Sequence, residues 1–194
     1  NTVSTDSYIS GSQIRGLIAS AIIRHRNLGR NAHLDTLFYQ AILSEQVHYH
    51  NAWITKYGST AGIIPRNLQK EKGKDKLSCA SDVFITKIAN GRSAGYLGIK
   101  DGEKQYLKIE PTKSAMFHHQ RNNRIGGKSE DGHIFYYESL DAGQEFRSVI
   151  TGPSDALEEL RNILGEEFKG NIGRSRSAQY SEVTIAISEL EDMP

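Results

Sequence analysis

The clearest hydrophobic pattern near the start of the chain follows Ser12. Apolar residues recur there at intervals of three and four, which predicts an amphipathic helix over residues 12–26 with one face turned to a core. Ser12 is the expected N-cap, and Asn27-Leu28-Gly29 is expected to end the helix, because Asn and Gly tolerate the left-handed conformation found there. The residues on the predicted core face are Ile14, Leu17, Ile18, Ala21 and Ile22.

Two further segments carry the same helical spacing. The first covers residues 33–44 and the second residues 154–165, where Pro153 precedes the first turn and Gly165 ends the helix or interrupts its last turn. Acidic side chains at the start of the later helix suit the positive end of its dipole. The expected core residues are Leu34, Leu37, Phe38, Ala41 and Ile42 in the earlier helix, and Ala156, Leu157, Leu160, Ile163 and Leu164 in the later one.

Alternation of apolar and polar residues predicts strands elsewhere in the chain. Residues 133–138 and 145–151 are expected to pair as a hairpin, because a short connection containing Gly143 joins them. Residues 57–82 are rich in glycine, serine and lysine, and are expected to form a long, mobile excursion. The other predicted strands are residues 47–53, 83–88, 96–99, 106–109, 114–120 and 180–187.

The order of these elements predicts the fold class. A helix, an inserted region, a hairpin, a helix and a strand make up most of a β-α-β-β-α-β unit, so we expect an α+β fold of the ferredoxin-like (RRM-like) kind. Its first strand would lie just before or around residue 1, which suggests a piece of a larger polypeptide. We expect residues 1–194 to form a single domain, with an inserted region at about residues 27–113 between the first helix and the hairpin.

Composition narrows the function classes. The chain has 194 residues, 24 Lys+Arg against 23 Asp+Glu, and one cysteine. A single cysteine, Cys79, excludes an intramolecular disulfide framework and a four-cysteine zinc site, and favours a reducing, cytoplasmic location. No run of about 18 apolar residues is present, so no membrane partner is expected. Two stretches, 113–128 and 169–176, hold basic residues and no acid, and such loops suit a polyphosphate partner.

Residues 170–177 are expected to form a loop of glycine, arginine and serine between the last helix and the last strand. Gly173 would allow a tight backbone path beside a ligand, and Arg174 and Arg176 would offer planar donors to phosphate oxygens. The loop lacks the Gly-Lys-[Ser/Thr] ending of a P-loop, so nucleotide hydrolysis is not expected. The alternative is a charged turn without a ligand. The hydroxyl donors of the loop are Ser175 and Ser177.

The start of the first predicted helix is a second candidate anion site. Backbone N–H groups at a helix start bind anions, and Gly11 beside Ser12 would let a ligand approach closely. The alternative is a capped helix that binds nothing. Both readings are compatible with the residues alone.

The histidines could carry chemistry, although their spacing assigns none. His48 and His50 share one face of a predicted strand, but no third metal ligand is placed beside them. His118 and His119 lie on opposite faces of another predicted strand, and either could stack on a base or act as a general base. We expect no metal, no cofactor and no intrinsic nuclease activity.

Four motifs, taken in order, resemble a known family (h, hydrophobic; x, any residue). Residues 8–19, YISGSQIRGLIA, resemble the Y-I-P-G-S-x-h-R-G-x-h-A opening of the RAMP superfamily, the RNA-binding subunits of CRISPR effector complexes. Residues 172–183 are similar to that superfamily's glycine-rich loop, h-G-R-S-R-S-x-x-Y-G-x-V. Residues 117–121 and 133–146 resemble a stretch of type III members, H-H-x-x-x-R … G-x-L-F-x-Y-E … G-x-x-F. With Ile64-Pro65-Arg66, the set is most similar to the type III-D subunit grouped with the Cas-five family.

The resemblance implies a ferredoxin-like, non-catalytic subunit that binds crRNA near its 5′ repeat-derived tag, in antiviral defence. Its partners would be crRNA, target RNA, the large signalling subunit and backbone RAMP subunits. The alternative is an endoribonuclease of the same superfamily, in which Asp75 or Asp82 with a metal cuts target RNA, or His118 or His119 processes crRNA. The residues expected to bind RNA are Gly11, Ser12, Arg15, His118, Arg121, Arg124, Gly173, Arg174, Ser175, Arg176, Ser177 and Tyr180.

Overall fold

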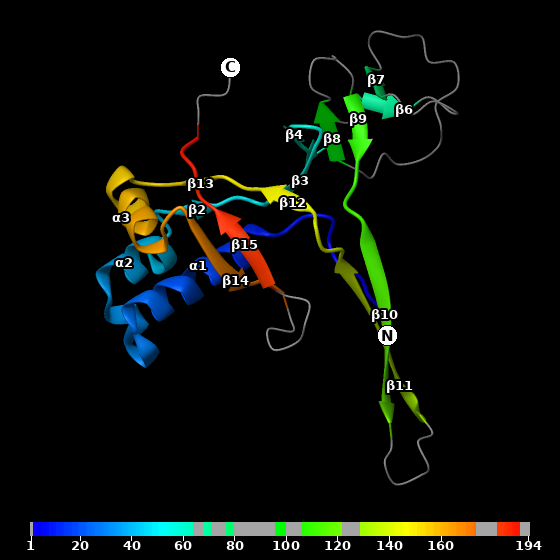
Figure 1. The fold of residues 1–194 in the computed structure, drawn as a ribbon, viewed down its shortest axis with the longest axis horizontal. Helices are drawn as coiled ribbons and strands as arrows, with labels where there is room; N and C mark the ends of the chain where they lie inside the picture. The colour runs from blue at the N-terminus through cyan, green and yellow to red at the C-terminus, as the bar shows by residue number, and fades with distance from the viewer. Residues whose placement is uncertain are drawn as a thin grey trace. The chain divides into compact units, whose positions relative to one another are not determined.

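The computed structural model in Figure 1 divides the chain into two compact units. Unit 1 comprises Asn1–Tyr8 and Trp53–Arg147, and unit 2 comprises Ile9–Ala52 and Ser148–Pro194. Helices combine with mainly antiparallel strands, so the expected α+β class is confirmed. A single domain with one inserted region stays a prediction. The structure describes residues 2–63, 68–70, 77–79, 96–99, 106–121, 129–173 and 182–190.

Helix α1 spans Gly11–Arg26 in unit 2, close to the predicted range. Its N-cap is Ser10 and not the expected Ser12. The Ser10 side chain accepts from the Gln13 N–H while the Gln13 side chain accepts from the Ser10 N–H, which forms a capping box. Asn27 ends the helix in the left-handed conformation, as predicted, with φ of 52°. The predicted core face is confirmed, because its members are buried: Ile14, Leu17, Ile18, Ala21 and Ile22.

The second predicted helix consists of three short helical segments. Asp35 divides the first from the second, and its side chain accepts from the Phe38 N–H as a cap. The prediction that Leu34 lies in the core is wrong: Leu34 is 74% exposed, because the α-helical phase starts only after Asp35. Leu37 and Ala41 are buried as predicted. In chain order the segments are the 3-10 helix η1 (Gly29–Leu34), α2 (Thr36–Phe38) and the π-helical η2 (Tyr39–Leu43).

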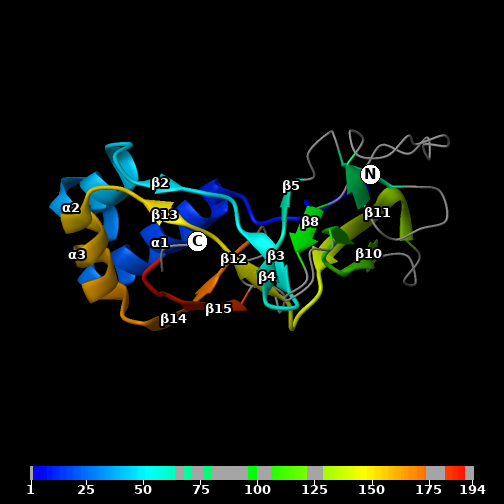
Figure 2. The same ribbon diagram turned by 90° about the horizontal axis from the view of Figure 1, so that it is seen from above.

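Helix α3 spans Ser154–Leu164, and Gly165 ends it as predicted. Its buried side chains are Ala156, Leu160 and Leu164, all on the predicted core face. Figure 2 shows the helices of unit 2 together, with strands β14 (Glu167–Asn171) and β15 (Glu182–Ala186) along one side of them. Among the described residues, no helix is long and apolar enough to cross a membrane.

Strand β14 is not predicted by the sequence pattern. It pairs antiparallel with β15, from Glu167 opposite Ala186 to Asn171 opposite Glu182. The prediction that residues 170–177 form a loop is therefore wrong at its start, because Gly170 belongs to β14. The strand predicted at 180–187 is confirmed as β15, and its inward residues Val183 and Ile185 alternate with exposed ones.

The longest strands of the chain lie in unit 1. Strand β10 (Lys113–Arg121) pairs antiparallel with β11 (Ser129–Leu140), and β1 (Thr2–Val3) pairs parallel with β11 on its other side. Two further three-stranded sheets have the orders β12-β3-β4 and β5-β8-β9, and β6 pairs with β7. These strands are β3 (Trp53–Lys56), β4 (Ser59–Thr60), β5 (Gly62–Ile63), β6 (Leu68–Lys70), β7 (Leu77–Cys79), β8 (Tyr96–Ile99), β9 (Tyr106–Ile109) and β12 (Glu145–Arg147).

The core of unit 1 lies between these short sheets. Ile54 on β3 and Ile109 on β9 are buried together with Ala61. Leu107 and Phe146 pack against this cluster and are partly buried. The apolar side chains of β3, β9 and β12 therefore hold the sheets of this unit together.

The predicted hairpin of residues 133–138 and 145–151 is wrong. Strand β11 pairs with β10 and β1, whereas β12 pairs with β3, and β13 (Ile150–Thr151) pairs with β2 (His48–Tyr49) in unit 2. The predicted strand 47–53 is divided in the same way, because β2 and β3 join different sheets. The cause is that strand pairing depends on residues distant in sequence. The local alternation of apolar and polar residues predicts a strand but not its partner.

The remaining strand predictions have mixed outcomes. Residues 96–99, 106–109 and 114–120 are confirmed as β8, β9 and β10. The described residues of the segment 57–82 form short paired strands, and the mobility expected of this segment stays a prediction. The strand predicted at 83–88 lies outside the described residues.

Candidate nucleic-acid interface

Gly11 lies against the backbone of β2 at the start of α1. A Cβ atom on Gly11 would stand 1.9 Å from the Tyr49 carbonyl oxygen, far inside van der Waals contact. The Gly11 N–H donates to Asn51 Oδ1 at 2.9 Å. Packing within unit 2 therefore requires this glycine, whether or not a ligand approaches it.

Most other N–H groups of the helix start also have acceptors inside the chain. The Ser10 N–H donates to Gln13 Oε1 at 3.0 Å, and the N–H groups of Gln13 and Ile14 donate to the Ser10 carbonyl. Ser12 is exposed, and its Oγ lies 2.9 Å from Ser10 Oγ. The anion-binding capacity expected of this helix start is thus reduced to the exposed Ser12 and its hydroxyl.

Arg15 lies on α1 near Ser12, and its side chain is exposed. The guanidinium acts on Tyr49: burial raises the pKa of the Tyr49 phenol to about 12, while the positive charge of Arg15 opposes this rise. The Tyr49 hydroxyl donates to the Ala41 carbonyl at 3.1 Å. Tyr49 is therefore a neutral structural group, and Arg15 is the cationic group that α1 presents near its start.

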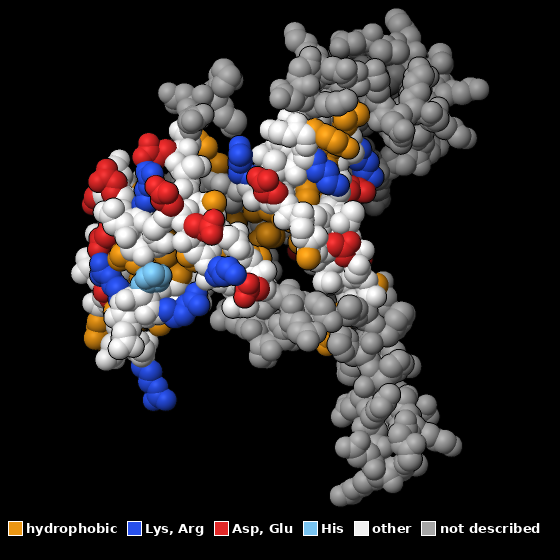
Figure 3. Space-filling model, viewed as in Figure 1, with side chains coloured by type: hydrophobic (Ala, Val, Ile, Leu, Met, Phe, Trp, Pro, Cys, Tyr) orange, Lys and Arg blue, Asp and Glu red, His pale blue; other side chains and the backbone are white. Residues whose placement is uncertain are grey.

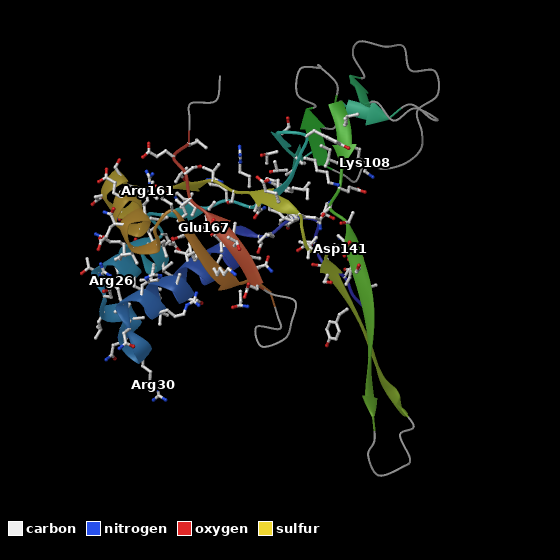
Figure 4. The ribbon with its side chains drawn as sticks, in the orientation of Figure 1. Arg26, Arg30, Lys108, Asp141, Arg161 and Glu167 are labelled. Atoms are coloured by element: carbon white, nitrogen blue, oxygen red, sulfur yellow. The ribbon has the colours of Figure 1, made fainter. Side chains whose placement is uncertain are left out.

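Arg26, at the other end of α1, is held by carboxylates. Its Nη1 lies 2.8 Å from Asp35 Oδ2, and its Nη2 lies 2.5 Å from Glu159 Oε1. Hydrogen bonding to Asp35 raises the pKa of Arg26 despite partial desolvation, so the side chain stays charged. Arg26 joins α1 to the cap of α2 and to α3 (Figure 4), which is a structural role.

Acidic and basic side chains are mixed over the face of unit 2 that Figure 3 shows. Among the described residues of this unit, Arg15 and Arg30 are exposed arginines that form no salt bridge with a described carboxylate. Arg24 donates to the Lys169 carbonyl at 3.3 Å. The other ion pairs join Arg161 to Glu189 and Lys169 to Glu182.

The glycine-rich loop lies between β14 and β15. Gly170 on β14 is buried, and a Cβ there would stand 2.2 Å from Leu17 Cδ1 of α1. Gly173, in contrast, is exposed with φ of 106°, a conformation that favours glycine, and a Cβ there would meet no atom. The residues expected to bind phosphate or bases in this loop lie outside the described residues: Arg174, Ser175, Arg176, Ser177 and Tyr180.

The contacts of β14 fix its direction along α1. The Lys169 carbonyl accepts from Arg24 in the last turns of α1, whereas the next residue, Gly170, lies against Leu17 nearer its start. The chain therefore runs toward the N-terminal half of α1 as it enters the loop at Gly173. Leu17 of the first sequence motif thus packs against Gly170 of β14, two residues before the last motif begins.

The other candidate residues belong to unit 1 or lie outside the described residues. His118 and His119 lie on β10 of unit 1, opposite Phe135 and Ile134 of β11, and Arg121 ends the strand opposite Ser129. The remaining candidates, Arg124, Asp75 and Asp82, lie outside the described residues. Among the described residues, no group of three histidine, cysteine or acidic side chains could hold a metal ion.

Two side chains of the middle motif have structural partners that the sequence analysis does not predict. Glu138 Oε2 accepts from the Thr5 N–H at 3.0 Å and lies 3.5 Å from Lys113 Nζ. Lys113 Nζ in turn donates to the Thr5 carbonyl at 2.6 Å. These contacts hold the segment after β1 beside β10 and β11. The side chain of Gln144 has a similar role toward Thr112.

Comparison with known proteins leaves the family open. No protein-family model matches the sequence, and no curated protein matches it significantly.

Proposed function

We propose that the chain is an RNA-binding subunit of a type III CRISPR effector complex, of the RAMP superfamily and most similar to its type III-D member of the Cas-five group. In this role it binds crRNA, near the 5′ repeat-derived tag, in the cytoplasm. The large signalling subunit and backbone RAMP subunits are its protein partners. It binds RNA and does not cut it.

The observation that carries the proposal is the packing of β14, the strand that leads into the glycine-rich motif, against the helix that holds the first motif. Residues 8–19 form the start of α1 and the segment before it, and β14 leads the glycine-rich loop toward the same half of the helix. Exposed Arg15 and Ser12 lie on that half. Arginine and serine beside a glycine turn suit contacts to the sugar-phosphate backbone of single-stranded RNA.

The strand order of unit 1 agrees with a ferredoxin-like arrangement in its neighbours and differs from it in one direction. In a β-α-β-β-α-β unit the third strand lies between the first and the second and runs antiparallel to both. Strands β1, β11 and β10 have this order, and β10 is antiparallel to β11, but the two-residue β1 pairs parallel with β11. Helix α1 follows β1, and α3 precedes β15, in the order that the unit requires. In this arrangement β15 would be the fourth strand; in the structure it pairs with β14.

A matched pair of substitutions tests RNA binding at α1. Arg15→Ala removes the exposed arginine of the first motif, and Arg30→Ala removes another exposed arginine, in η1 and outside both motifs. Binding of a labelled single-stranded RNA is measured over a range of salt concentrations. We expect Arg15→Ala to weaken binding and to reduce the slope of log K against log salt by about 0.7, the value for one phosphate contact on a single strand.

The Arg30→Ala control shows whether a loss of RNA binding in Arg15→Ala is specific to the start of α1. Arg30→Ala should leave affinity and slope unchanged. Equal losses from both substitutions would indicate diffuse attraction without a site, and a wild-type chain that binds no RNA would contradict the proposal. RNA cleavage that depends on magnesium and is lost in Asp75→Ala or Asp82→Ala would instead support the endoribonuclease alternative.

A further inference from the structure

Tyr57 occupies a backbone position that ordinarily excludes a large side chain. Lys56 of β3 pairs with Ser59 of β4, so Tyr57 and Gly58 form a two-residue hairpin loop. Both have positive φ, 54° for Tyr57 and 75° for Gly58, as a type I′ turn requires. Asn-Gly is the favoured pair in such a turn, and a bulky residue at its first position is an outlier.

Packing of the tyrosine ring in the core does not offset the strain of this backbone conformation. Tyr57 is 64% exposed, whereas the core of unit 1 is made by Ile54, Ala61 and Ile109. A strained residue that contributes nothing to the core and is nevertheless large and aromatic indicates a role outside the fold.

The charges beside the turn favour an anionic partner. Lys56, next to Tyr57, donates from Nζ to the Glu110 carbonyl at 3.2 Å. Lys108 Nζ lies 2.9 Å from Glu110 Oε1, and its side chain stays partly exposed. Among the described residues, Lys56 forms no ion pair with a carboxylate, whereas Lys108 is paired with Glu110. Figure 4 labels Lys108, and in Figure 3 basic side chains lie beside hydrophobic ones here.

We propose that Tyr57 is a stacking platform for an unpaired base of single-stranded RNA. Exposed aromatic rings and neighbouring positive charge, as Tyr57 and Lys56 provide here, are the means by which proteins bind single strands without reading their sequence. Tyr57 stands in the loop of the β3–β4 hairpin, and 64% of it is exposed. This inference rests on the proposed RNA-binding function and adds a base contact in unit 1 to the backbone contacts expected in unit 2.

The test compares three variants of the full chain. Tyr57→Asn removes the ring and supplies the residue that the turn prefers, and Tyr57→Trp restores an aromatic face. Tyr39→Asn removes a tyrosine of η2 that is similarly exposed, at 54%. The measurements are the unfolding temperature and the affinity for a labelled single-stranded RNA of mixed sequence at several salt concentrations.

We expect Tyr57→Asn to raise the unfolding temperature while weakening RNA binding at least about fivefold, the low end for loss of one stacked base. The salt slope should not change, because no phosphate contact is lost. Tyr57→Trp should bind as the wild type does, and Tyr39→Asn should bind RNA normally.

Three results would overturn the inference. If the wild type binds RNA and Tyr57→Asn binds it equally well, the stacking role fails while the proposed function stands. If the wild type binds no RNA, both fail together. A Tyr57→Trp variant as weak as Tyr57→Asn would also exclude stacking, since indole stacks at least as well as phenol.

Discussion

The side-chain amide of Gln144 pairs with the backbone of Thr112 as a strand neighbour would. Gln144 Oε1 accepts from the Thr112 N–H at 2.7 Å, and Nε2 donates to the Thr112 carbonyl at 3.0 Å and to the Asp141 carbonyl at 2.8 Å. Thr112 immediately precedes β10 and Asp141 immediately follows β11. One side chain therefore closes the end of this strand pair where Lys113 lies opposite Leu140.

Replacing Gln144 should destabilise unit 1. Gln144→Ala removes three hydrogen bonds from a half-buried position and leaves backbone groups of Thr112 and Asp141 without partners. Because Thr112 is exposed and water can replace its bonds, we expect a loss of about 1 kcal/mol in the free energy of unfolding, measured with urea. Glu145→Ala, at the exposed neighbouring position, is the control and should stay within about 0.5 kcal/mol of the wild type. Equal stability of both variants would contradict this role.

Gly11 and Gly16 on α1 should respond oppositely to the same substitution. A Cβ at Gly11 would collide with the Tyr49 carbonyl, so Gly11→Ala should cost about 2 kcal/mol or more. A Cβ at Gly16 would meet no atom within 4 Å, so Gly16→Ala should stabilise the helix by up to about 1 kcal/mol. Thermal unfolding of the two variants measures this. Destabilisation by Gly16→Ala would mean that the helix is constrained there in some other way.

Local patterns in the sequence predict the helices well because helical contacts are local. The core face of α1, including Leu17 and Ile22, follows from spacing alone, and Gly165 ends α3 where expected. Leu34 shows the limit: its spacing fits the helix that follows, but Asp35 caps α2 after it and leaves it outside the helical phase.

Strand partners are less predictable because they depend on distant residues. Strand β14 reads Glu-Phe-Lys-Gly-Asn, a polar segment with a glycine, and gives a weak local signal. What makes it a strand is tertiary: Phe168 is buried, and Gly170 leaves room for Leu17. Likewise β12 joins β3 and not β11, although a short glycine turn separates β11 from β12.

The candidate site is predictable only in part for the same reason. That residues 8–19 would form a helix start follows from their sequence, and Gly173 does adopt a glycine-favoured conformation. The packing of Gly11 against Tyr49 depends on a strand some 40 residues away in the sequence. A local motif therefore does not predict it. The sequence pattern does not indicate Tyr57 as a binding residue, although a Tyr-Gly pair between two short strands could indicate a two-residue turn.

The Arg26–Asp35 pair should make stability depend on acid pH. Desolvation raises the pKa of Asp35, but the hydrogen bonds from the Phe38 N–H and the Arg26 side chain outweigh it, so the pKa is lowered. A carboxylate with a lowered pKa in the folded state stabilises fully above its ordinary value of about 4, and this stabilisation is lost as the pH falls below that value.

Asp35→Asn isolates this contribution, because asparagine keeps a capping side chain without the charge. The wild type should be the more stable protein at pH 7, and the difference in unfolding free energy should narrow as the pH falls below about 4. Urea unfolding at a series of pH values measures the difference. A constant difference across the series would show that Asp35 acts as a cap alone.

The glycine-rich loop gives the sharpest test of RNA binding. Gly173 turns the chain at the end of β14, and Arg174 and Arg176 follow it in the sequence. The double substitution Arg174→Ala, Arg176→Ala should weaken RNA binding about tenfold or more, because charge-assisted hydrogen bonds to phosphate are among the stronger polar contacts. The salt slope should shrink by about 0.7 for each phosphate contact that is lost.

A charge-matched control decides between a site and general attraction. Lys72→Ala with Lys74→Ala also removes two positive charges, from the lysine-rich stretch between residues 70 and 76. If the loop binds RNA, the arginine pair reduces affinity and slope while the lysine pair changes them little. Equal effects of the two pairs would mean diffuse electrostatic attraction. Unchanged affinity and slope in the arginine variant would leave the loop as a turn between β14 and β15, and the resemblance would then lose its strongest functional support.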